Sequence, residues 1–149
     1  MAELLVRNAN DNDIKAIADL EVTCLKAPWP ERVIVDELHT NPCAIVLVGE
    51  IDGAVVAYLD FMITFDSATI SRIAVNPDYR RRGFARILIE KMVEICAKQE
   101  EKVEWITLEV RESNEKAIGL YSNTGWEKVT IKKNYYDDGE NAIYMVRTL

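Results

Sequence analysis

The sequence predicts a single α+β domain in which helices cover a mixed β-sheet. The expected elements follow the order strand, helix, helix, three strands, helix, strand, helix and two strands, which is typical of this class. The hydrophobic pattern switches between helical and strand spacing along the chain. No repeat, low-complexity tract or Pro/Gly/Ser-rich linker interrupts the 149 residues. Residues 1–149 are therefore expected to form one domain with about seven strands and about four helices.

One strand and two helices are predicted for the first forty residues. Residues 3–9 form the strand, and Asn10 or Asp11 can cap the helix that follows. Pro28-Trp29-Pro30 ends this helix, and Pro30 suits the first turn of a second helix that reaches about Leu38. The apolar residues that the first helix is expected to turn inward are Ile14, Ile17, Ala18, Leu20 and Leu25.

A β-hairpin is predicted next. Residues 44–51 and 54–64 are apolar and rich in β-branched side chains, and Asp52-Gly53 between them is a strong hairpin signal. Near the end of the chain we expect a helix, with Gly125 as its C-cap, and then two strands. These last three elements span residues 114–124, 126–132 and 142–147.

A basic turn connects a strand to a helix in the middle of the chain. The strand 68–75, the helix 83–98 and the strand 103–110 should contain a parallel pair with a right-handed crossover. The turn reads Arg80-Arg81-Arg82-Gly83-Phe84-Ala85-Arg86. A helix start attracts phosphate because it presents unpaired N–H groups and the positive end of the helix dipole. Gly83 and Ala85 would let a bulky anion approach the backbone. The alternative is a solvated turn that only caps the helix.

The composition argues against several classes of protein. The net charge is −7, and no apolar run approaches the ~20 residues needed to cross a bilayer. We therefore expect neither a nucleic-acid binder nor a membrane protein, and we expect a cytoplasmic location. The three cysteines are expected to be free thiols, with Cys96 in the core, and the single histidine, His39, is expected near a helix end. This set of side chains favours neither a metal site nor a Ser–His–Asp triad.

The basic turn carries a resemblance to a known family. Arg80-x-x-Gly83-x-Ala85, preceded by Ile73-Ala74-Val75-Asn76-Pro77, resembles the Q/R-x-x-G-x-G/A coenzyme A motif of GCN5-related N-acetyltransferases. Ala85 replaces the last glycine of the motif, and the family tolerates alanine there. The resemblance covers essentially the whole chain. The segments similar to protein N-terminal acetyltransferases, and to their RimI branch of ribosomal-protein alanine N-acetyltransferases, are Leu108 to Asn114, Ala117 to Tyr121, Asn134-Tyr135-Tyr136, Asp138-Gly139-Glu140 and Ala27-Pro28-Trp29.

The resemblance implies acetyl-CoA as the cofactor and direct transfer of its acetyl group to an amine. Glu109 matches the family's general base and Tyr121 its general acid. The residues implied in cofactor binding are Ile73, Ala74 and Val75 through their backbone N–H groups, Arg80, Arg81, Arg82, Gly83, Phe84, Ala85, Arg86 and Asn114. Trp29, Tyr135 and Tyr136 match the loops that frame the acceptor. Without the resemblance, Glu109 could be an exposed strand residue, Tyr121 a core residue, and the two hairpin tyrosines cross-strand packing.

The acceptor is expected to be a protein N-terminus with a small first residue such as alanine or serine. At pH 7, neutralising an α-amine of pKa near 7.7 costs about 1 kcal/mol, whereas neutralising a lysine of pKa near 10.4 costs about 4.6 kcal/mol. A ribosomal protein is a candidate substrate. Two alternatives remain open: acetylation of a lysine or a small amine, and a non-catalytic module that binds acyl-CoA.

Overall fold

The computed structural model describes residues 3–149 and confirms the predicted α+β fold. One seven-stranded mixed sheet has the order β1-β2-β3-β4-β5-β7-β6. Residues 1 and 2 of the expected domain lie outside the described residues. The strands are β1 (Leu5–Asn8), β2 (Ala44–Ile51), β3 (Ala54–Thr64), β4 (Ser67–Val75), β5 (Trp105–Arg111), β6 (Glu127–Lys132) and β7 (Ala142–Thr148). The α-helices are α1 (Ile14–Cys24), α2 (Glu31–His39), α3 (Phe84–Ala97) and α4 (Glu115–Ser122).

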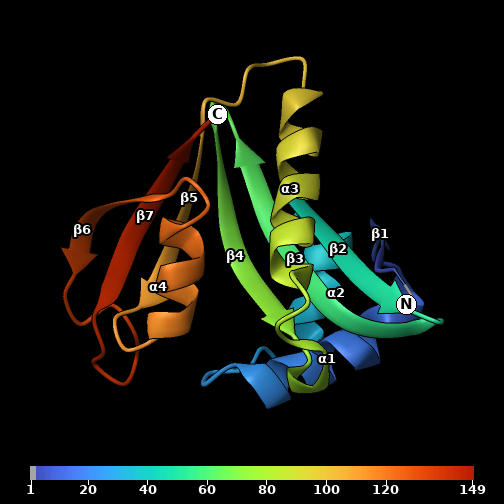
Figure 1. Cartoon of the computed structure of the whole chain (residues 1–149). Coiled ribbons are helices and arrows are strands. Elements are labelled where there is room, and N and C mark those ends of the chain that lie inside the picture. The colour runs from blue at the N-terminus through green and yellow to red at the C-terminus, as the bar shows by residue number, and fades with distance from the viewer. Residues whose placement is uncertain (1–2) are drawn as a thin grey trace.

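Helices cover both faces of the sheet. Figure 1 shows α3 and α4 on one face, with α1 and α2 on the other. Leu88 and Met92 of α3 are fully buried in the larger core cluster, which also takes in Cys96. Ile17 and Leu20 of α1 bury their side chains in a second cluster on the opposite face. The spacing of these apolar residues gives each helix one inward stripe. No helix within residues 3–149 is long and apolar enough to cross a membrane.

The sheet opens where β4 and β5 part. The two strands pair in parallel only over Ser67–Thr69 and Trp105–Thr107. Beyond Thr69, β4 stays paired with β3 as far as Val75, while β5 follows β7 as far as Arg111. The β3–β4 register shifts beside Phe61, which bends β4 at a β-bulge. The two strands therefore diverge toward the lower end of the molecule in Figure 1.

The end of α4 differs from the prediction by two residues. The regular helix stops at Ser122 with Asn123 as its C-cap, but the turn that follows ends at Gly125, whose φ of +92° is the left-handed conformation of a helix-terminating glycine. The Thr124 hydroxyl donates to the Leu120 carbonyl (2.7 Å), and the Trp126 N–H donates to the Tyr121 carbonyl (3.1 Å). These bonds satisfy the last carbonyls of the helix.

The first helices also differ from the prediction in detail. Asn10 caps a single 3-10 turn over Asp11–Asp13, and α1 follows directly after this turn. Leu25 lies just beyond α1 as its C-cap, and Pro30 is the N-cap of α2 rather than a residue of its first turn. His39 is confirmed as an exposed residue in the last turn of α2.

Candidate active site

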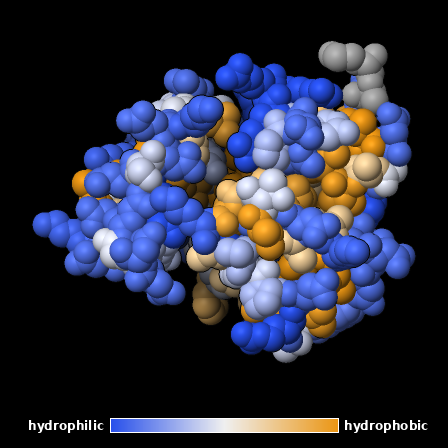
Figure 2. Space-filling view, turned by 90° about the horizontal axis from the view of Figure 1, so that it is seen from below, coloured by the Kyte–Doolittle hydropathy of each residue, from blue (hydrophilic) through white to orange (hydrophobic). Residues whose placement is uncertain are grey.

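A cavity of about 640 Å³ occupies the gap between β4 and β5. This volume lies within the range of about 300–1,000 Å³ that is usual for small-molecule sites. Figure 2 views the molecule from this end and shows a hollow between its two halves, with hydrophobic side chains gathered beside it. Six of the residues predicted for the site line the cavity, namely Ile73, Glu109, Asn114, Tyr121, Tyr135 and Tyr136.

Glu109 lies in β5, opposite Tyr144 of β7. Its side chain is only 17% exposed, and Oε1 accepts a hydrogen bond from Nζ of Lys132 at 2.7 Å. Thr107, on the same face of the strand, is buried and shares a 2.9 Å hydrogen bond with Thr69 of β4. Glu109 therefore faces the cavity just beyond the point where β4 and β5 separate, and it is not a freely exposed strand residue.

Tyr121 of α4 is both a core residue and a cavity residue. It is 5% exposed, and its ring lies 5.5 Å from that of Trp126. Burial raises the pKa of its phenol to about 12, with a smaller contribution from Tyr136. Within residues 3–149 its hydroxyl makes no hydrogen bond, although the residue lines the cavity. A protonated phenol with a free hydroxyl can donate a proton to a leaving group.

The edge of β4 that faces the gap offers unpaired backbone groups. The Asn76 N–H donates to the Val56 carbonyl of β3 (2.8 Å). Because backbone groups alternate in direction along an antiparallel strand, the N–H groups of Val75 and Ile73 point away from β3, and that of Ala74 points toward it. Ile73 and Val75 are thus the two residues of this segment that can donate into the gap. The Val75 carbonyl accepts from Nε of Arg80 at 3.1 Å.

The basic turn begins where this edge ends. A 3-10 turn over Pro77–Tyr79 leads to Gly83, the N-cap of α3, which has a φ of +77°. No atom would lie within 4 Å of a Cβ added at Gly83, and no side chain caps the helix, so its first N–H groups stay open to a ligand. Phe84 buries its side chain and can offer only its backbone. The exposed side chains of the turn are Arg80, Arg81, Arg82 and Arg86.

The basic turn and the cavity together fit an elongated anionic thioester. The turn itself does not line the cavity; the open edge of β4 connects the two. A molecule lying along this edge can place phosphate at the start of α3 and its reactive end beside Ile73. Asn114 serves the fold as well, because its Oδ1 caps α4 by accepting from the Ala117 N–H (3.2 Å). Ala85 at the start of α3 is half-buried.

The expected acceptor residues divide into two groups. Tyr135 and Tyr136 line the cavity, with ring centroids 5.0 Å apart, and the Arg111 guanidinium lies 4.0 Å from the centre of the Tyr136 ring. Trp29 does not line the cavity. Its ring packs against the guanidinium of Arg72 at 4.8 Å, so it supports the wall from behind. Leu25 and Ala27, which precede it in the same loop, line the cavity instead.

A buried ion pair behind this wall was not predicted from the sequence. Glu21 of α1 is fully buried and accepts hydrogen bonds from Arg72 and from the hydroxyl of Tyr58. Arg72 lines the cavity and also donates to the Ala27 carbonyl at 2.9 Å. The sequence did carry a signal, because Glu21 follows Leu20 on the inward stripe of α1, where an apolar residue is the rule.

Asp60 is a second charged residue at an apolar position. It lies in β3, directly opposite Arg72 in the register, and is 1% exposed. Burial, followed by the neighbouring carboxyl group of Glu37, raises the pKa of this carboxyl to about 9. Asp60 is therefore protonated at neutral pH, and it leaves Glu21 as the carboxylate that balances Arg72.

Replacing Arg72 tests the importance of this pair for folding. We expect Arg72→Met to lower the free energy of unfolding by about 3 kcal/mol, because it leaves the Glu21 carboxylate buried without its cation. The Glu21→Met/Arg72→Met double variant should regain most of this loss, because it removes both buried charges. Urea denaturation measures both, with Lys91→Met, from an exposed i,i+3 pair, as the control. A loss below 1 kcal/mol in Arg72→Met would contradict this role.

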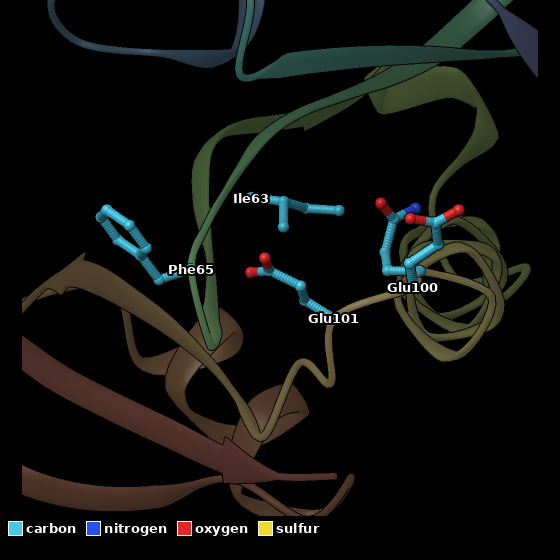
Figure 3. A pocket seen from close by; sticks show the side chains of 5 residues that line it. Ile63, Phe65, Glu100 and Glu101 are labelled. Carbon is cyan, nitrogen blue, oxygen red and sulfur yellow. The ribbon is translucent and has the colours of Figure 1, made fainter.

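Another hollow, of about 380 Å³, lies at the opposite end of the sheet. Figure 3 labels four of its lining residues, Ile63, Phe65, Glu100 and Glu101, and Gln99 also lines it. Its charged side chains are carboxylates, so it repels the phosphates of a nucleotide cofactor. Within residues 3–149, no three His, Cys, Asp or Glu side chains form a group suited to hold a metal ion.

Comparison with known proteins identifies the family. Residues 14–126 match the model of the acetyltransferase (GNAT) family. A Bacillus subtilis protein named, provisionally, as a [ribosomal protein bS18]-alanine N-acetyltransferase is 38% identical over 97% of this chain and 95% of its own length. An N-alpha-acetyltransferase of Saccharolobus solfataricus is 33% identical over 99% of this chain and 94% of its own. The crystal structure of the ribosomal-protein-S18-alanine N-acetyltransferase from Escherichia coli is 31% identical, covers 98% of this chain and 94% of that chain, and superposes with a TM-score of 0.87.

The chain therefore belongs to the acetyltransferase (GNAT) family, as the coenzyme A motif indicated. It is an acetyl-CoA-dependent N-acetyltransferase.

Proposed function

We propose that this enzyme acetylates the N-terminal α-amine of proteins in the cytoplasm, with small first residues such as alanine or serine as preferred acceptors. Among the relatives that match over nearly their whole length, two are named as alanine N-acetyltransferases of ribosomal protein bS18 and another as an N-alpha-acetyltransferase. A ribosomal protein is therefore the first candidate substrate. The observation that carries the proposal is the meeting of Glu109 and Tyr121 in one cavity at the end of the open β4 edge.

The cofactor-binding roles follow from the backbone. Acetyl-CoA supplies an acetyl thioester to the cavity when it is bound. The open N–H groups at the start of α3 and the exposed arginines of the turn from Arg80 to Arg86 hold its pyrophosphate. The N–H groups of Ile73 and Val75 stabilise the negative charge that develops on the carbonyl oxygen. Asn114, at the wall of the cavity, contributes a further polar contact.

Two side chains move protons in the proposed reaction. Glu109 accepts a proton from the acceptor ammonium, directly or through one water, so that the neutral amine can attack. Tyr121 gives its proton to the departing thiolate, and its raised pKa keeps the phenol protonated at neutral pH. A single carboxylate suits an α-amine, which loses its proton near pH 8, better than a lysine, which needs about pH 10.

The acceptor peptide enters between the two loops that border the cavity. Tyr135 and Tyr136 form one side, and Leu25 and Ala27 form the other. Trp29 does not contact the acceptor in this proposal; it supports Arg72, which lines the cavity. Leu25, Ala27 and Met62 give this part of the cavity an apolar lining, which fits a small uncharged first side chain.

Thiol release from acetyl-CoA tests the proposal. The purified enzyme is offered Ala- and Ser-initiated peptides, Nα-blocked lysine peptides and small amines. We expect release with the free N-termini and at least tenfold less with the blocked lysine peptides. The opposite preference would assign the chain to lysine acetylation. Binding of coenzyme A without release on any amine would make it a non-catalytic module.

A further inference from the structure

We propose that Lys132 positions Glu109 by holding one of its carboxylate oxygens, so that the other faces the acceptor amine. Lys132 is the last residue of β6, and its Nζ donates to Oε1 of Glu109. Within residues 3–149 nothing donates a hydrogen bond to Oε2, and Glu109 lines the cavity. The inference rests on the proposed role of Glu109 as the base and adds a residue that acts through it.

The ammonium group of Lys132 is confined by aromatic rings. It reaches across β7, where its Nζ lies 4.4 Å from the ring centre of Tyr144, and it lies 5.5 Å from the ring centre of Tyr135. Tyr144 faces Glu109 directly in the β5–β7 register. The negative faces of the rings attract the cation and limit the positions that a flexible lysine can occupy. Lys132 is thus held at the point where it meets Glu109.

No other cation near Glu109 is available for this role among the described residues. Arg111, two residues along the same strand, is bound by Asp138 and Glu140, each at 2.8 Å. Arg72, which also lines the cavity, is bound by Glu21, and the remaining titratable neighbours are the phenols of Tyr121, Tyr135, Tyr136 and Tyr144. The hydrogen bond to Glu109 raises the pKa of Lys132, so the lysine stays charged throughout the neutral range.

The pair has one consequence for the reaction. Engagement of Oε1 fixes the rotation of the carboxylate and turns Oε2 to the cavity, where an ammonium or an ordered water can bind. Lys132 itself does not need to touch the substrate.

Lys132→Met tests the inference. We expect kcat at pH 7 to fall about tenfold, because a carboxylate that is free to rotate is less often aligned with the acceptor amine. The KM for acetyl-CoA should stay within twofold. Lys132→Arg should restore most of the wild-type kcat, because a guanidinium can also donate to Oε1.

Matched variants separate this inference from the proposed function. Lys133→Met removes an exposed neighbouring lysine and should leave kcat unchanged. In a Glu109→Gln background, Lys132→Met should change kcat less than twofold, since the lysine would have lost the base through which it acts. An unchanged kcat in Lys132→Met, or an equal loss in both backgrounds, would overturn the inference and leave Glu109 as the base. An unaltered Glu109→Gln enzyme would instead overturn the proposed mechanism.

Discussion

Glu109→Gln should lower kcat/KM at pH 7 by about 10²–10³-fold, within the range that general base catalysis usually provides. The amide keeps the size of the side chain but cannot accept a proton from the acceptor ammonium. The loss should shrink as the pH rises through about 8, because an increasing fraction of α-amine is then neutral without help. Initial rates of thiol release between pH 6 and 10 measure this effect.

Glu112→Gln is the matched control for this variant. Glu112 follows β5 directly and is exposed, and its backbone N–H donates to the Asn141 carbonyl. It does not line the cavity. We expect wild-type rates in Glu112→Gln at every pH. A Glu109→Gln enzyme with a loss that does not depend on pH would show that this carboxylate does not take the proton of the amine.

Tyr121→Phe should lower kcat by about 10²-fold and leave the affinity for acetyl-CoA within twofold. The ring packing against Trp126 is preserved in this variant, and the lost hydroxyl has no hydrogen-bond partner in the described chain. The effect is expected at the low end for general acid catalysis, because a thiolate is already a fair leaving group. Steady-state kinetics and calorimetric titration with acetyl-CoA measure the two quantities.

The pH profile gives Tyr121 a second test. Because burial raises the pKa of this phenol to about 12, it stays protonated as the pH rises to about 10. Any basic limb of the wild-type profile below pH 10 must then have another source and should persist in Tyr121→Phe. The melting temperature serves as the control for folding. Activity within twofold of wild type would exclude Tyr121 as the proton donor.

The strands and helices were predictable because each carries a local signal. The β-branched run of β3, the Asp52-Gly53 turn and the inward stripe of α3 all depend on neighbours in sequence. The basic turn was equally local, since Gly83 and the arginines before it lie within a few residues of a helix start. The regular part of α4 ends two residues before the predicted position, where the hydroxyl of Thr124 donates to the Leu120 carbonyl, and only the folded chain shows that bond.

The wall of the cavity could not be predicted, because its contacts join distant elements. Glu21, Tyr58 and Arg72 come from α1, β3 and β4, and only the folded sheet brings them together. Trp29 was expected to contact the acceptor, but its ring packs against the guanidinium of Arg72 instead. Lys132 reaches Glu109 across β7, and the two residues lie too far apart in the sequence for a local pattern to predict their contact. The roles of Glu109 and Tyr121 stay predictions that the variants above test.

The position of the transferred acetyl group tests the central claim most directly. A peptide that starts with alanine and carries one internal lysine offers both kinds of amine to the same active site at the same concentration. After reaction with the enzyme and acetyl-CoA at pH 7, fragmentation by mass spectrometry locates the acetyl group. We expect the acetyl group on the N-terminal α-amine in at least about 90% of the product, since neutralising the lysine side chain costs about 3.6 kcal/mol more than neutralising the α-amine. An acetyl group found mainly on the lysine side chain would contradict the proposed function.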